Sequence, residues 1–219
     1  MSDMTSSRLK MALLYLASAL TIAAVLSAQH GGQSENPARY ETADRNQWQM
    51  PEKVVEALDL KPGMVVADIG AASGYFSRRF SPAVGPRGRV LAVDIDGEAL
   101  AWLARQAGEQ GLANLDTLHA LPDDPRLPEK GVDLVFMCNT LHHLPDRPAY
   151  LRRLRQSLTA NGRVAIVDFF KKALPVGPSS PEHKLSREEA IAAFTTAGYT
   201  IDREFDFLAY QYFFIARPE

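Results

Sequence analysis

Residues 65–76 have the sequence Val65-Val-Ala-Asp68-Ile-Gly70-Ala-Ala-Ser-Gly74-Tyr-Phe76, and the fold class follows from this segment and its flanks. The apolar run Met64–Ile69, with an acid near its end, predicts a strand that is covered on both faces, as in a parallel sheet. The small residues of Gly70–Gly74 predict a tight loop, and a helix is expected to begin at Tyr75. A strand, a glycine loop and a helix in this order are typical of an α/β protein that binds its ligand at the carboxyl ends of parallel strands.

The same alternation continues through the chain. Further strands are expected at Arg89–Asp94, Leu115–His119, Val132–Met137 and Arg163–Asp168, and helices at Pro51–Leu60, Glu98–Gln110, Pro148–Leu158 and Ser186–Ala197. Asn161-Gly162 is expected to stop the helix that precedes it, and Ser186 with Glu189 predicts a capping box at the next one. Thr200–Phe205 and Gln211–Ala216 are expected to form an antiparallel pair. An α/β fold with a mostly parallel sheet is the prediction.

Composition narrows the function. The chain has 219 residues, of which 46% are hydrophobic and 23% charged, which indicates one globular domain. Its net charge of −2 gives no basic excess, so a nucleic-acid partner is not expected. Cys138 is the only cysteine, which excludes an internal disulfide and a cysteine zinc site, and no metal site is expected.

The N-terminus predicts export. Arg8 and Lys10 precede 18 uncharged residues, Met11–Ala28, which is typical of a signal peptide and just long enough for one membrane span. Both interpretations predict a periplasmic or secreted protein, with membrane contact only through an uncleaved residue 11–28 segment. A buried N-terminal helix and a misplaced start codon are the alternatives. The expected division is therefore 1–28 as signal peptide or anchor, 29–50 as a polar linker and cover segment, and 51–219 as the functional domain.

The loop after the first strand predicts a nucleoside cofactor. A dinucleotide loop needs Gly-x-Gly-x-x-Gly, but Ala72 and Tyr75 stand where the second and third glycines belong. A phosphate-binding Walker loop needs a lysine that is absent here. Asp94 ends the second strand 20 residues after Gly74, where a carboxylate can accept two hydrogen bonds from a ribose diol, and Ile95 can lie against an adenine ring.

This pattern resembles the first motif of the class I S-adenosylmethionine-dependent methyltransferases, with Ala72 in place of a glycine. Asp133–Asp146 and Leu158–Asp168 are similar to later motifs of the family, so the resemblance covers about Arg45 to Arg217. It implies a seven-stranded, Rossmann-like sheet with an antiparallel last strand, S-adenosylmethionine as cofactor and a small-molecule acceptor. The implied cofactor-binding residues are Asp68, Gly70, Ala71, Ala72, Gly74, Asp94, Ile95 and Asn139. Asp68 would meet the ammonium group of the cofactor. Arsenite methylation would imply several cysteines, which this chain lacks.

Methyl transfer requires a base only when the acceptor must lose a proton. The candidates are His143, His142 and Asp168, and since neighbouring residues of a helical turn point about 100° apart, only one histidine is expected to face the site, with His143 favoured. His183, with Lys184 and Arg187, could meet an anionic acceptor. Tyr210 is a further candidate, and Trp48 could either cover the cofactor or fasten the first helix to the domain.

The sequence is therefore compatible with three functions. The chain is expected to be a small-molecule methyltransferase. An exported, non-catalytic domain that binds S-adenosylmethionine as a sensor is the first alternative, because this cofactor is made in the cytoplasm. A nucleotide-dependent oxidoreductase is the second, although the glycine spacing disfavours it.

Overall fold

The computed structural model describes residues 37–42, 44–180 and 183–219, and Pro37–Glu219 form one compact unit. The expected signal peptide or anchor at residues 1–28 lies outside the described residues, as does the first part of the expected linker. Within the described ranges, every helix is too short or too polar to cross a membrane.

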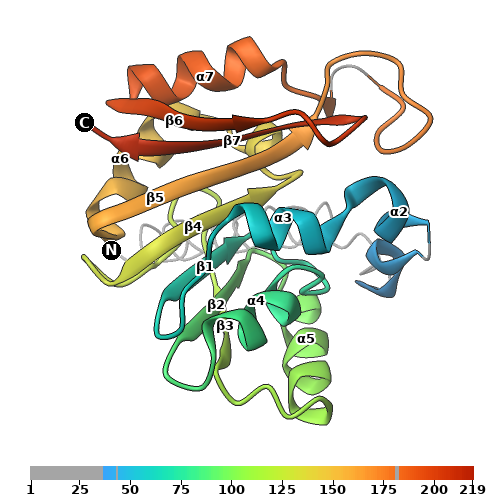
Figure 1. Ribbon diagram of the computed structural model, residues 1–219, viewed down its shortest axis with the longest axis vertical. Helices are drawn as coiled ribbons and strands as arrows, with labels where there is room; N and C mark the ends of the chain where they lie inside the picture. The colour runs from blue at the N-terminus through green and yellow to red at the C-terminus, as the bar shows by residue number, and fades with distance from the viewer. Residues whose placement is uncertain (1–36, 43, 181–182) are drawn as a thin grey trace, which may run out of the picture. The chain divides into compact units, whose positions relative to one another are not determined.

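The core of the unit is a seven-stranded sheet (Figure 1). Its strands are β1 (Val65–Ile69), β2 (Arg89–Asp94), β3 (Leu115–His119), β4 (Val132–Cys138), β5 (Leu158–Phe169), β6 (Tyr199–Phe205) and β7 (Gln211–Pro218). They lie in the order β3-β2-β1-β4-β5-β7-β6; the first five are mutually parallel, and β7 runs antiparallel to both of its neighbours. The predicted α/β class, the mostly parallel Rossmann-like sheet and its antiparallel last strand are confirmed. Strand order reverses between β1 and β4, which is where an open α/β sheet binds its ligand.

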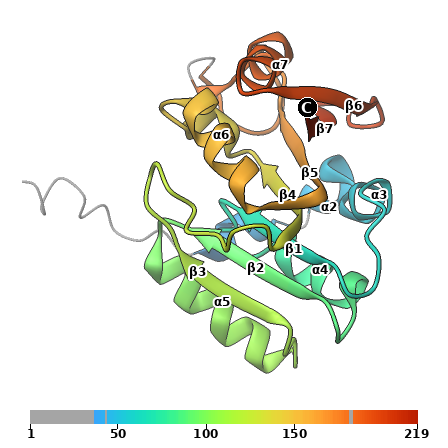
Figure 2. The ribbon, with the colours of Figure 1, turned by 90° about the vertical axis from the view of Figure 1, so that its left-hand side faces the viewer.

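Helices cover both faces of the sheet, as Figure 2 shows from the side. One face carries α3 (Pro51–Ala57), α4 (Ser77–Val84) and α5 (Gly97–Glu109), and the other carries α6 (Arg147–Ser157) and α7 (Arg187–Thr196). Successive residues of β4 alternate between the two cores: Phe136 packs with the α3–α5 side and Met137 with the α6–α7 side. Burying side chains of this size contributes about 1.5–3 kcal/mol each. The predicted capping box of α7 is present, formed by Ser186 and Glu189.

Three short elements complete the unit: η1 (Pro37–Glu41), α2 (Arg45–Gln49) and η2 (Leu141–His143). Residues 37–50, expected to be part of a linker and cover segment, belong to the compact unit. Gln49 is fully buried.

The expected helix stop at Asn161-Gly162 is wrong. Helix α6 ends at Ser157, because Leu158 is already extended (φ −74°, ψ 141°) and begins β5. The pairing of β4 with β5 shifts register between Val132 and Leu134. A Cβ on Gly162 would lie 2.8 Å from Leu158 Cβ, so this glycine allows close backbone packing within an irregular strand and does not form a left-handed helix end.

Candidate active site

A cavity of about 500 Å³ opens at the carboxyl ends of β1, β2 and β4, next to the point where strand order reverses. Of the residues predicted to bind the cofactor, those that line it are Asp68, Gly70, Ala71, Ala72, Asp94, Ile95 and Asn139. Gly74 lies outside the lining. His143 lines the cavity as well, whereas His142 and Asp168 do not.

The two loop glycines serve different purposes. Both have left-handed backbones, with φ +73° at Gly70 and +74° at Gly74. A Cβ on Gly70 would collide with the side chain of Thr140, and one on Gly74 would collide with Leu103 of α5. Gly70 therefore lets the loop pass close to the end of β4 beside the cavity, and Gly74 lets α5 pack against the loop.

Asp94 holds the loop in place. Its Oδ2 accepts a hydrogen bond from the backbone N–H of Ala72 at 2.8 Å, and its Oδ1 accepts one from Asp96 N at 3.0 Å. Ala72 has a left-handed backbone with φ +46°, a conformation that costs a non-glycine residue about 1–2 kcal/mol. The carboxylate of Asp94 thus compensates for the strain at the position where the family has a glycine.

Asp68 provides a buried acid beside the cavity. Its side chain accepts a hydrogen bond from Ser77 Oγ at 2.5 Å, and the residue is 3% exposed. Burial raises its pKa to about 6, and the hydrogen bond from Ser77 opposes this shift. The group is therefore mostly ionised at neutral pH. The hydroxyl of Ser73, in the same loop, is buried without a hydrogen-bond partner in the described part of the chain.

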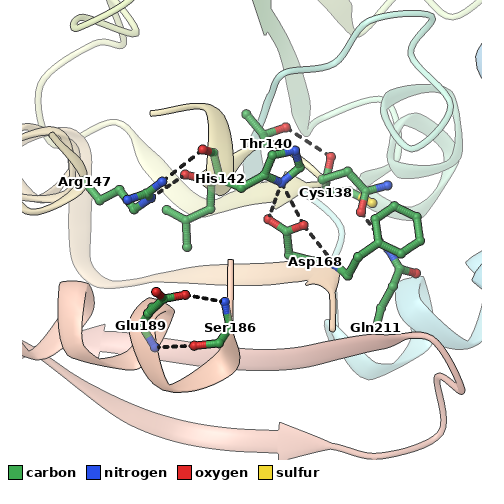
Figure 3. Close-up of polar contacts among 11 residues, drawn as sticks. Cys138, Thr140, His142, Arg147, Asp168, Ser186, Glu189 and Gln211 are labelled. Atoms are coloured by element: carbon green, nitrogen blue, oxygen red, sulfur yellow. Dashed lines mark hydrogen bonds and ion pairs between the residues drawn. The ribbon is translucent and has the colours of Figure 1, made fainter. Parts of the chain in front are cut away.

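The two neighbouring histidines of η2 have different surroundings, and Figure 3 shows those of His142. His142 Nδ1 lies 2.9 and 3.0 Å from the two carboxylate oxygens of Asp168, and both side chains are almost completely buried. Arg147 donates to the carbonyl oxygens of Leu141 and His142 and so holds η2 against α6. As a result, the next side chain along the chain, His143, faces the cavity.

His143 is suited to accept a proton. Burial and the neighbouring His142 ring, whose centroid is 4.1 Å away, lower the pKa of His143, while Asp168 acts in the opposite direction. A lowered pKa leaves the imidazole neutral at physiological pH, the state that a general base requires.

The structure does not bring the other predicted residues together around an anion. Lys184 is buried and its Nζ donates to the carbonyl of Lys172 at 2.7 Å, while Arg187 pairs with Glu204. Both cations are used within the protein, so the predicted anionic-acceptor cluster with the exposed His183 is wrong. Tyr210 lies outside the cavity lining.

Trp48 also lies outside the lining. Its ring packs against Phe169 with the centroids 5.6 Å apart, so it fastens α2 to the end of β5.

Sequence reasoning missed one cation. Among the residues that the structure describes, Arg45 of α2 is the only lysine or arginine that lines the cavity. Its guanidinium lies 3.8 Å above the ring centre of Tyr75 and donates to the carbonyl of Tyr40 at 2.6 Å. The resemblance begins at Arg45, but only the packing of α2 on the domain shows that this residue reaches the site.

Comparisons with known proteins agree with this geometry. A family model described as a methyltransferase domain matches residues 67–164. The ubiquinone/menaquinone biosynthesis C-methyltransferase UbiE of Shewanella frigidimarina (strain NCIMB 400) is 26% identical over 135 residues, which cover 61% of this chain and 50% of that protein. The chain therefore spans about half the length of the curated relatives it matches.

Two solved structures are informative. A SAM-dependent methyltransferase from Aquifex aeolicus is 28% identical, with a TM-score of 0.77 over 84% of this chain and 98% of that one. The [4+2]-cyclase SpnF is 14% identical, with a TM-score of 0.65 over 78% of this chain and 80% of that one, and shows the shared fold alone.

Residues 67–164 thus match a methyltransferase domain, and the predicted resemblance to the class I S-adenosylmethionine-dependent methyltransferases is confirmed by these comparisons, which support S-adenosylmethionine as the cofactor. The site fits this group. Asp68 offers a buried carboxylate to an ammonium, the buried hydroxyl of Ser73 has no hydrogen-bond partner among the described residues, and Ile95, at 60% exposed, offers an apolar face to a base. The methyltransferase domain match and the SAM-dependent methyltransferase structure both agree with the expected class I methyltransferase.

Proposed function

We propose that this enzyme transfers the methyl group of S-adenosylmethionine to a small acceptor molecule that shares the cavity with the cofactor. When bound, S-adenosylmethionine supplies a methyl group whose bond to sulfur breaks, with its electron pair going to sulfur, as the acceptor forms the new bond to carbon. The observation that carries the proposal is the single cavity that combines the cofactor loop with His143. Its volume lies in the range of small-molecule sites.

Holding the cofactor is the proposed task of the loop and of two acids. Asp68 would pair with the ammonium group, and Asp94 would accept hydrogen bonds from the ribose hydroxyls. Backbone N–H groups at the start of α4 would meet the carboxylate. Ile95 would lie against the adenine, and Asn139 and Ala71 would border the cofactor from the ends of their strands.

His143 is proposed as the general base. Its neutral imidazole would take the proton that the acceptor loses, and the rate gain expected from such a base is about 10²–10⁴-fold. His142 and Asp168 are proposed as positioning residues, because their hydrogen-bonded pair and the contacts of Arg147 fix the turn that carries His143. UbiE is named as a C-methyltransferase, which is one reaction in which an acceptor carbon loses a proton.

The test is to incubate the full chain with S-adenosylmethionine labelled in the methyl group and with fractionated small-molecule extract. Appearance of label in a small product supports the proposal. Cofactor binding without transfer to any fraction would favour the non-catalytic sensor, and label found only in protein or nucleic acid would contradict the acceptor class.

We also propose that residues 1–28 direct the chain out of the cytoplasm. The support is the sequence pattern of a basic start followed by an uncharged apolar run. Cell fractionation with N-terminal sequencing of the recovered protein tests it; a cytoplasmic protein that begins at Met1 would contradict it.

A further inference from the structure

A chain of buried amides links α2 to the cavity. Arg45 Nε donates to Gln49 Oε1 at 3.3 Å, Gln49 Nε2 donates to Gln211 Oε1, and Gln211 Nε2 donates to Asn139 Oδ1 at 2.7 Å. Gln49 and Gln211 are 0% and 1% exposed, so solvent does not compete for these bonds. These three hydrogen bonds connect helix α2, strand β7 and the residue that follows β4.

Arg45 determines which end of each amide in this series donates and which end accepts. A guanidinium carries only donors, whereas an amide can present either end. Because Arg45 must donate to Gln49, the Gln49 amide nitrogen turns to Gln211, and the Gln211 nitrogen turns to Asn139. The reverse order would set the NH₂ group of Gln49 against Arg45 and leave two donors facing each other.

This order leaves one group of Asn139 for the cavity. Its Oδ1 is engaged by Gln211, and among the described residues none accepts from its Nδ2. The backbone of Asn139 is also fixed, because its N–H donates to Val167 of β5 at 2.9 Å and its φ is +56°. Asn139, whose amide nitrogen has no acceptor among the described residues, is part of the lining that also contains His143 and Arg45.

We propose that Asn139 Nδ2 binds an oxygen of the methyl acceptor, and that the acceptor is an oxygen-bearing molecule of the phenol or enol class. The inference rests on the proposed function and adds its substrate class. An acceptor that loses its proton to His143 leaves negative charge on oxygen, and a fixed donor beside that oxygen stabilises it. Arg45 adds positive charge to the same cavity. Gln49 and Gln211 are positioning residues that keep the donor turned inward.

The experiment uses the full chain loaded with S-adenosylhomocysteine and the probe 4-nitrophenol, whose absorbance reports whether it is ionised. 4-Nitroanisole, which cannot ionise, is the matched ligand. We expect the wild-type protein to prefer the phenolate. In Gln211→Glu, the carboxylate can only accept, so Asn139 must rotate and turn its oxygen inward. We expect phenolate affinity to fall about tenfold or more, with little change for 4-nitroanisole.

Two further variants serve as controls. Gln211→Met has a similar size and releases Asn139 without reversing it, so we expect a smaller loss, about threefold. In Asn139→Asp, a carboxylate oxygen still accepts the hydrogen bond from Gln211, but the amide N–H donor is lost. If Gln211→Glu does not fold, the same loss of phenolate affinity is expected and measured in Asn139→Asp. Circular dichroism and thermal unfolding report folding in each case.

The outcomes separate cleanly. Phenolate affinity in Gln211→Glu within about twofold of wild type, or a wild-type protein that does not distinguish the two ligands, overturns the inference. Gln211→Glu could instead bind S-adenosylhomocysteine more weakly but bind 5′-methylthioadenosine, which lacks the amino-acid group, as the wild type does. That result would assign the Asn139 donor to the cofactor carboxylate and would also overturn the inference. Failure of the proposed function would appear elsewhere, as absence of methyl transfer by the wild-type enzyme.

Discussion

The two sides of the cavity are built in different ways. The loop side consists of residues 68–74 with Asp94, and its members are close in sequence or lie on adjacent strands. The network side consists of Arg45, Gln49, Asn139, His143 and Gln211, which come from α2, the end of β4, η2 and β7. Gln49 and Gln211 are 162 residues apart in the chain yet share a buried hydrogen bond.

This difference shows how each side keeps its geometry. The loop side depends on backbone conformation, because glycine and small residues adopt the left-handed turns it requires. The network side depends on packed side chains that position each other through hydrogen bonds. We therefore expect substitutions on the network side to change reaction rate or ligand preference, and those on the loop side to change cofactor affinity and stability.

The largest effect is expected at His143. His143→Ala should lower kcat by about 10²–10⁴-fold, because a general base is lost, while the affinity for S-adenosylhomocysteine stays within about twofold. Initial rates and calorimetry measure the two quantities. His183→Ala, at an exposed histidine outside the cavity lining, is the comparison; it should leave the affinity unchanged and alter kcat only slightly, because His183 also lowers the pKa of His143. Equal losses of rate and affinity would indicate a packing role for His143.

Next in size is Gly70→Ala on the loop side. A left-handed backbone and a collision with Thr140 should together lower the free energy of unfolding by about 2–4 kcal/mol, as measured by urea denaturation. Gly63→Ala is the control, because Gly63 has φ +95° with no heavy atom within 4 Å of an added Cβ. In Gly63→Ala, only the left-handed backbone conformation is unfavourable, so the free energy of unfolding should fall by about 1–2 kcal/mol. Similar losses at both positions would argue against the close approach of the loop to β4.

Asp94→Ala should weaken binding of S-adenosylhomocysteine by about 1.5–3 kcal/mol, because charge-assisted hydrogen bonds to the ribose are lost. The support for Ala72 N–H is lost in the same variant. Calorimetry provides the measurement, and Asp116→Ala, an exposed acid of neighbouring β3, should bind normally. Unchanged affinity in Asp94→Ala would refute the ribose assignment.

Acidification should weaken cofactor binding through Asp68. The pKa of this carboxyl is about 6 in the free protein, and a bound ammonium would favour its ionised form. Affinity should therefore fall below pH 6, by up to about tenfold per pH unit, with proton release on binding that is detectable by calorimetry in buffers of different ionisation enthalpy. Affinity that is constant from pH 5 to 7 would contradict the pairing.

The same shift has the opposite effect on the stability of the free protein. A folded pKa raised above the ordinary value of 3.8 means that the folded state binds the proton more tightly than the unfolded chain. The contribution of Asp68 to stability is fully present below about pH 4 and is lost as the pH rises through 6.

The smallest effect is expected at Ala72. Replacing it with glycine removes left-handed strain of about 1–2 kcal/mol but adds the backbone entropy cost of glycine, so Ala72→Gly should stabilise the protein by about 0.5–1 kcal/mol. Thermal unfolding measures this. A destabilised Ala72→Gly would show that the alanine methyl group makes contacts worth more than its strain.

Much of the loop side could be predicted from sequence. Asp68, Gly70 and Asp94 are recognisable because the strand, loop and helix that carry them follow one another along the chain and the spacing is local. The helix stop at Asn161-Gly162 was wrong because the irregular β4–β5 pairing, a tertiary contact, turns these residues into part of a strand. Lys184 and Arg187 were misassigned because no local pattern shows that a cation is already paired.

By itself, the sequence determined the alternation of strands and helices and the glycine loop with its acids, since these depend on backbone preference and hydrophobic periodicity over short segments. The class of cofactor was implied by the resemblance of that loop to a methyltransferase motif. Only the tertiary structure decided which of two adjacent histidines faces the cavity, that Arg45 reaches it, and which end of the Asn139 amide accepts from Gln211. Those features depend on hydrogen bonds between segments far apart in the chain, and such bonds leave no periodic trace in the order of residues.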